Sequence, residues 1–513
     1  MNYTSSNISR DDSVWQMGQG QRKAVPVTKR NPTFETWGLL LLGCAVLAVL
    51  LWPVYPENDA VAFVGLFSLF TAFAVAIMMN PYYPAVPQFT VALFGVQHVV
   101  CPLVYYHYPD LAVAFPVTPA FMETFRLSCW ATAIFAASVL VVTAGCSVQS
   151  SAIVLRQALS RRHRVALINW AWTVWLGTSL LTLVMRGFPI AALAFLWFLF
   201  LSLQVVSMCV LIYLLPKQKC KKFVILVIAV HTIFALQTTF FSHIALASAI
   251  ALLLLAHRFQ WRVKLVLILL GGLIVSAAIQ NEKDEFRDIA WYGRGRSFSL
   301  SERLDFWAEE LPTELKTLSS GMTIHKVWPI VERLNQAKII EQVVRRTPEE
   351  EPLANGETFV MATKLIIPRL LWQEKPVDYS RIIFRKYTGY PLEAVSMGVG
   401  FLGEFYLNFG EYALLGFFVY SLSIALISRY WIKMGSRFPL WWAWFFYVMN
   451  YWIRFEIDFA KALNYTVKAA FVFACLVVVS RLWQRALGFS KGSAVRRRKH
   501  PIPENAAECS LQW

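Results

Sequence analysis

Twelve apolar stretches, each about as long as a membrane-crossing helix, dominate this sequence. An α-helix rises about 1.5 Å per residue, so about twenty apolar residues cross a hydrocarbon core of ~30 Å. Hydrophobic residues make up 57% of the 513 residues and charged residues only 15%, which is little charge for a soluble protein. We therefore expect an all-α polytopic membrane protein with spans at residues 37–55, 60–79, 86–105, 123–147, 166–185, 189–215, 223–239, 242–256, 265–280, 405–428, 438–453 and 464–482.

The distribution of Lys and Arg predicts how these spans are oriented. Basic clusters occur in every second connection, as the positive-inside rule requires of cytoplasmic segments, while Glu57, Asp59 and Asp110 lie in connections between them. The polar middle of residues 223–256 favours a hairpin or a re-entrant pair, and the alternation holds only if this segment crosses twice. We therefore expect about twelve spans with both termini cytoplasmic. The basic clusters contain Arg156, Arg161, Arg162, Arg164, Lys217, Lys219, Lys221, Lys222, Arg258, Arg262, Lys264, Arg429, Lys433 and Arg437.

The formal net charge of +17 follows from this topology. Cytoplasmic Lys and Arg orient the helices and attract anionic lipid, so membrane lipids are expected partners and nucleic acid is not. The basic run 496–499 is interpreted in the same way, as a retention signal beside the membrane. The eight cysteines form no C-x-x-C pair and none lies in residues 281–400, so neither a zinc site nor a disulfide framework is expected.

Five regions follow from this topology, in a chain expected to be a multi-pass membrane protein. They are a cytoplasmic tail (1–36), spans one to nine (37–280), a large loop outside the cytoplasm (281–400), spans ten to twelve (401–483) and a basic cytoplasmic tail (484–513).

The outer loop is the one long hydrophilic segment, and we therefore expect the active site to include it. Loops of this length are usually functional or disordered, and apolar residues at helical spacing argue for a folded one. Val331, Leu334, Ala337, Ile340 and Val344 form one such stripe, and a weaker amphipathic pattern over 301–316 is interrupted by Pro312. We expect a few short helices lying over the membrane face.

Several residues in and after this loop suit a lipid-linked diphosphate. Arg and Lys side chains, such as Arg333 and Arg345, match phosphate oxygens and would stabilise a departing diphosphate. A carboxylate or imidazole, such as Glu404 or His325, could deprotonate an attacking sugar hydroxyl. Glu404, Asn408 and Glu411 share a helix face if a helix begins near Gly403.

Simpler interpretations stay open for the same residues. Arg333, Arg345 and Arg346 fit solvated faces or ion pairs with the Glu349–Glu351 run equally well. A lone histidine such as His325 is more often structural than catalytic. Glu404 could satisfy only the dipole at a helix N-terminus.

Three segments carry a resemblance to a known family. Pro368-Arg-Leu-Leu-Trp-Gln-Glu-Lys-Pro376, then Gly403-Glu-Phe-Tyr-Leu-Asn-Phe-Gly410, and the earlier Gly356-Glu-Thr-Phe359 are similar to segments of bacterial oligosaccharide repeat-unit polymerases, the Wzy-like O-antigen polymerases. The resemblance covers about residues 330–425. It implies a GT-C-like, metal-independent glycosyltransferase without a cofactor, which polymerises undecaprenyl-diphosphate-linked repeat units into O-antigen, exopolysaccharide or capsule at the outer face of the membrane.

The resemblance also implies roles for individual residues. Carried over by position, Arg333, Arg345, Arg369 and Lys375 would hold the diphosphate or the acceptor, and Glu404 with Asn408 would order the site. Taken together with the chemistry above, the candidate catalytic residues are Glu404, Arg369 and His325, and the candidate residues for binding diphosphate or glycan are Arg333, Arg345, Lys375, Tyr406 and Asn408. A chain-length regulator and a flippase are candidate protein partners.

Two other functions fit the same architecture. An O-antigen ligase, or another glycosyltransferase that uses a lipid carrier, would share the helices and the outer loop. A secondary transporter often has twelve helices, but transporters generally show internal repeats and midplane charges, and neither is evident here.

Overall fold

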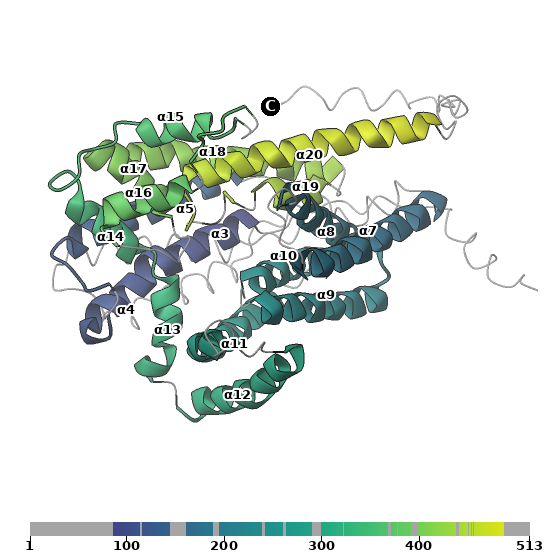
Figure 1. Cartoon of the computed structure of the whole chain (residues 1–513), viewed down its shortest axis with the longest axis horizontal. Helices are drawn as coiled ribbons and strands as arrows, with labels where there is room; N and C mark the ends of the chain where they lie inside the picture. Colours follow the sequence, from purple (N-terminus) through teal and green to yellow (C-terminus); the bar gives the residue numbers. More distant parts are fainter. Residues whose placement is uncertain are drawn as a thin grey trace, which may run out of the picture. The chain divides into compact units, whose positions relative to one another are not determined.

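A computed structural model of the chain is all-helical wherever it is described (Figure 1). The described residues belong to the compact unit of residues 52–513. The expected spans at 37–55 and 60–79 lie outside them. The described residues are 86–112, 115–143, 161–187, 194–238, 242–259, 263–289, 299–321, 323–367, 371–376, 378–390, 398–437, 441–449, 451–452, 454 and 456–486.

The helices before the loop follow the apolar stretches of the sequence. One continuous helix of 22 residues runs from Val86 to His107 and contains a π-helical turn in its middle. The elements are α3 (Val86–Gly95), η3 (Val96–Val100), α4 (Cys101–His107), η4 (Pro109–Leu111), α5 (Phe121–Thr143), α7 (Arg161–Gly187), α8 (Ala194–Leu214), α9 (Lys217–Thr238), α10 (Ser242–Phe259) and α11 (Val263–Arg287).

The segment 223–256 forms two helices rather than one. α9 ends at Thr238, α10 begins at Ser242, and the two helices pack against each other. Two helices in this segment agree with the expected hairpin.

The described residues of the loop form five helices after α11, and two predictions made from its sequence patterns are wrong. These helices are α12 (Leu300–Ser320), α13 (Ile324–Leu334), α14 (Ala337–Arg346), α15 (Glu357–Lys364) and α16 (Tyr379–Thr388). α12 continues through Pro312 and starts at a capping box, in which Ser299 and Glu302 bond each other's backbone N–H groups. The single stripe expected over Val331–Val344 spans two helices instead, because Asn335 is extended and its side chain accepts the Lys338 N–H at 3.2 Å.

The chain after the loop forms α17 (Gly400–Phe409), η7 (Gly410–Tyr412), α18 (Ala413–Arg437), α19 (Trp441–Met449) and α20 (Phe459–Ala486). Among the described residues, three helical stretches are long and apolar enough to cross a membrane: Val86–His107, Phe121–Thr143 and Gly400–Gly435. These stretches are consistent with a membrane protein, and the full count of twelve spans stays a prediction.

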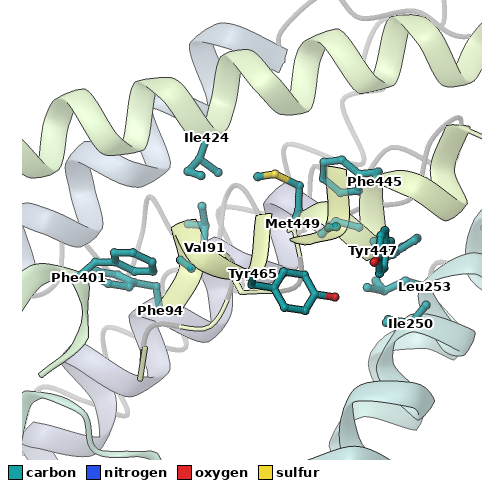
Figure 2. Packing of buried hydrophobic residues seen from close by; sticks show 14 of the residues in the cluster. Val91, Phe94, Ile250, Leu253, Phe401, Ile424, Phe445, Tyr447, Met449 and Tyr465 are labelled. Carbon is teal, nitrogen blue, oxygen red and sulfur yellow. The ribbon is translucent and has the colours of Figure 1, made fainter. Parts of the chain in front are cut away.

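A shared apolar interior connects the loop helices with the apolar helices. Figure 2 shows side chains from several helices gathered around this interior, including Phe94 of α3, Phe401 of α17, Ile424 of α18 and Tyr465 of α20. α14 packs against α5, α16 and α17, and α15 packs against α17 and α20. Of the loop helices, α14, α15 and α16 are therefore held against α17 and α20, whereas α12 and α13 pack against α11 (Figure 1).

Candidate functional site

Asn408 joins the two motif segments that lie far apart in the sequence. Its side-chain oxygen accepts the Gly356 N–H at 2.9 Å, and its amide nitrogen donates to the Thr358 hydroxyl and to the Glu404 backbone carbonyl, both at 2.7 Å. Asn408 is buried. Both the oxygen and the nitrogen of the Asn408 amide are hydrogen-bonded within the protein. Asn408 therefore positions α15 against α17 rather than offering a free group to a ligand.

Glu404 lies buried beneath this contact, on the same helix. Its Oε2 accepts the backbone N–H of Phe459 at 2.6 Å, and the Thr358 side chain hydrogen-bonds its carboxyl group. Phe459 is the first residue of α20, so one carboxyl group links α15, α17 and α20. A carboxylate at a helix N-terminus is also favoured by the helix dipole.

Asp458 adds a second buried carboxyl group beside Glu404. Its Oδ1 accepts the Lys461 N–H at 2.8 Å and so caps α20, while Oδ2 has no hydrogen-bond partner among the described residues. Gly398 makes room for it, since a Cβ on Gly398 would lie 3.2 Å from Oδ2 and 2.9 Å from the Glu456 carbonyl oxygen. The two carboxyl groups interact electrostatically.

Tyr379 stands at the edge of this carboxyl pair and is only half-buried. Burial raises the pKa of its hydroxyl, and the acidic groups of Glu357, Glu404 and Asp458 raise it further. Tyr379 therefore stays protonated at neutral pH and can donate a hydrogen bond. We call Thr358, Tyr379, Glu404, Asn408 and Asp458 the α15–α17–α20 junction.

The cations expected to hold phosphate have different surroundings. Arg333 pairs with Glu456 at 2.8 Å. Glu456 comes two residues before Asp458 in the sequence, so this ion pair adjoins the junction. Arg345 is exposed at the end of α14 and has no ion pair among the described residues. Lys375 donates to the carbonyl oxygens of Leu365 and Ile367, the latter at 3.0 Å, and so caps the end of α15.

The other predicted site residues lie apart from these contacts. Tyr406 donates its hydroxyl hydrogen to Glu123 Oε1 at 2.9 Å. His325 is exposed in the first turn of α13, and no described contact joins it to Glu404. Arg369 lies outside the described residues.

A second polar cluster, which the sequence did not indicate, surrounds α14. Lys338 is buried, pairs with Glu332 at 3.5 Å and lies 4.5 Å from the centre of the Phe115 ring. Glu341 accepts the Thr118 N–H at 2.5 Å. Burial lowers the pKa of Lys338 and raises that of Glu341. This cluster ties α14 to the connection before α5.

Asp458, Thr358 and Tyr379 are the junction residues that sequence reasoning missed. An Asp immediately before an apolar helical stretch is a helix N-cap signal, which would have singled out Asp458 as the start of α20. The position of Tyr379 carries no comparable signal, because only the fold brings α16 to the end of α20.

One known family model matches the part of the chain that includes most of the junction. The model of a domain of unknown function, DUF8712, matches residues 160–435, which is more than half of the chain. The chain belongs to the DUF8712 family. The matched part contains Thr358, Glu404 and Asn408, and it ends before Asp458. No curated protein and no solved structure matches the chain.

Proposed function

We propose that this DUF8712 protein polymerises oligosaccharide repeat units linked to a lipid diphosphate, of the undecaprenyl type, at the outer face of the bacterial cytoplasmic membrane. It would do so as a glycosyltransferase of about twelve spans. The proposal rests on the motif resemblance together with one geometric observation. The segments that carry the resemblance, around Thr358, Glu404 and Asn408, meet in a single hydrogen-bonded junction that also holds Asp458.

The junction offers the groups that a glycosyl transfer needs. The acceptor hydroxyl would attack the anomeric carbon of the donor glycan, and the bond from that carbon to the diphosphate oxygen would break. The lipid diphosphate leaves with the bonding electrons, and exposed cations such as Arg345 would stabilise its charge. The hydroxyl proton passes to a carboxylate.

We assign this proton to Asp458 rather than to Glu404. The carboxyl group of Glu404 serves the fold, because its Oε2 accepts the Phe459 N–H and the group also hydrogen-bonds the Thr358 side chain. Oδ2 of Asp458 has no described partner and therefore keeps its capacity to accept a proton. Glu404 is then a positioning residue that fixes the start of α20.

The substitution Asp458→Asn tests this assignment. Asn caps helices as well as Asp does, so α20 should keep its start, while the general base is lost. We expect polymer formation from lipid-linked repeat units to fall by about 10²- to 10⁴-fold with an unchanged amount of folded protein in the membrane. Wild-type polymer formation by this variant would overturn the assignment.

Asp378→Asn is the matched control. Asp378 caps the neighbouring helix α16 by accepting the Arg381 N–H at 3.3 Å, as Asp458 caps α20. This control should leave polymer formation unchanged, because Asp378 lies outside the junction. A similar loss in both variants would point to folding rather than to proton transfer.

Deletion of the gene separates the competing functions. A polymerase predicts that long-chain polysaccharide disappears while single lipid-linked units persist. A ligase predicts that polymer forms and stays on its carrier, and a transporter predicts substrate uptake in proteoliposomes. Either of the last two results contradicts the proposal.

A further inference from the structure

The membrane-crossing stretch Gly400–Gly435 is longer than a bilayer requires. Its 36 residues would reach about 54 Å, whereas the hydrocarbon core is ~30 Å thick. The 25 residues of α18 alone are sufficient to cross. The stretch is also broken at Gly410, which has a positive φ of 55°. α17 and the junction therefore lie beyond one end of the hydrocarbon core.

An exposed apolar face runs along α18 and continues past its first residue. Only 33% of the apolar window in Gly400–Gly435 is buried, so most of its surface faces outward. Leu415 and Val419 are 66% and 58% exposed, one turn apart, and Tyr412 just before them is 75% exposed. An exposed aromatic residue at this position is typical of the level of the lipid headgroups.

The same face extends onto α15, which is distant in sequence. Phe359 stacks on the exposed Phe409 with ring centres 5.8 Å apart, so the neighbouring Val360, 54% exposed, lies beside the end of α17. Beyond the end of α15, Ile367 and Leu371 are also exposed, at 41% and 77%. Lys364, also exposed, places a positive charge among these residues.

We propose that α15, together with the side chains of Ile367 and Leu371 after it, rests on the lipid bilayer, at the boundary between headgroups and acyl chains. Three observations favour lipid as the occupant: the face is continuous with the outward face of α18, an exposed tyrosine lies where the two meet, and a lysine accompanies the apolar side chains. Elements that lie in the interface have this composition. The proposal does not depend on the reaction catalysed.

A consequence is that the α15–α17–α20 junction lies at the depth of the headgroups. Thr358 precedes Val360 by two residues, and Asn408, which directly precedes Phe409, hydrogen-bonds both Thr358 and the Glu404 carbonyl. A lipid diphosphate carries its charge at that same depth, so the bilayer itself would bring such a substrate level with the junction.

Fluorescence quenching on the full chain in lipid nanodiscs tests the proposal. In a cysteine-free background, Val360→Cys, Leu371→Cys and Tyr412→Cys would each carry an environment-sensitive fluorophore. Glu349→Cys, exposed in the connection between α14 and α15, is the matched control. We expect lipids with a spin label high on the acyl chain to quench the three sites at least about twofold more than the control, and aqueous iodide to quench them less.

Two results would overturn the proposal. Strong iodide quenching at residues 360 and 371, equal to that at residue 349, would show that α15 faces water. Weak quenching by both agents at these two sites would show that a protein surface, such as a second copy of the chain, covers them. Neither result bears on polymer formation, so the proposed function is tested separately.

Discussion

The backbone N–H of Phe459 donates a 2.6 Å hydrogen bond to Oε2 of Glu404, across 55 positions of the sequence. The bond connects the first turn of α20 to the middle of α17 and is shielded from water, since Glu404 is 3% exposed. A buried donor that loses its acceptor pays the full cost of its desolvation, so this bond is costly to remove. Glu404 therefore fixes where the last helix starts.

Removal of this acceptor should destabilise the protein. Glu404→Ala removes the acceptor of the Phe459 N–H and one partner of the Thr358 hydroxyl and opens a cavity, so the free energy of unfolding should fall by about 2–4 kcal/mol. Glu404→Gln keeps an oxygen that can accept the Phe459 N–H, so it should stay close to wild type. Thermal unfolding in detergent measures both variants, and equal losses would contradict this role.

The sequence predicted these contacts in part. Glu404, Asn408 and Gly356 were grouped by motif, and the fold brings them together through hydrogen bonds. Lys375 was expected to bind phosphate with the same motifs, but it donates to backbone carbonyls at the end of α15. The position at which a helix ends, and hence which carbonyls are left for a lysine to cap, is set by the fold. Asp458 was missed because its only local signal is that of an N-cap, and its nearness to Glu404 arises from tertiary packing.

In the fold as well, features set by local sequence were predicted and features set by tertiary contacts were not. Apolar length alone placed the stretches at 86–105 and 123–147 within a few residues of the observed helices, since the length of a membrane crossing constrains them. The break at Asn335 could not be predicted from periodicity. It depends on a side-chain cap and on Gln336, whose N–H donates to the carbonyl of Gln97 at 3.2 Å.

Gly389 is predicted to tolerate no side chain. Its φ is 76°, and a Cβ there would collide with the guanidinium of Arg346, which pairs with Glu350 at 3.0 Å. Gly389→Ala should lower the free energy of unfolding by about 1–2 kcal/mol. Gly321→Ala is the control, because nothing lies within 4 Å of the added Cβ and the backbone there is extended. A destabilisation of equal size in the control would contradict the steric explanation.

Stability should depend on pH through Glu282. Burial raises its pKa from 4.5 to about 7, and a hydrogen bond with the Glu314 carboxyl and repulsion from it act in the same direction. The unfolded chain releases this proton near pH 4.5 and the folded chain only near pH 7. The contribution of Glu282 is therefore fully present below pH 4.5 and is lost as the pH rises to about 7.

Glu282→Gln should remove this dependence. The unfolding temperature of the variant relative to wild type should rise between pH 4.5 and 7 and level off above that range. Glu309→Gln, an exposed change on α12, should show no such trend. A difference that stays constant over the whole range would mean that Glu282 ionises normally in the folded protein.

Exchange of the charges of Arg333 and Glu456 tests whether this pair acts in the reaction. Their side chains are 40% and 42% exposed, so the pair should contribute only about 0–1 kcal/mol to stability. If Arg333 binds diphosphate, Arg333→Ala should reduce polymer formation about tenfold or more, as expected for one charged hydrogen bond. The exchanged double variant, Arg333→Glu with Glu456→Arg, separates binding from structure. It would restore the ion pair but not the activity, because the cation then lies on the other segment.

Recovery of polymer formation in the double variant would assign Arg333 a purely structural role. Arg346→Ala, which removes a cation already paired with Glu350 and Glu351, is the control and should leave activity unchanged.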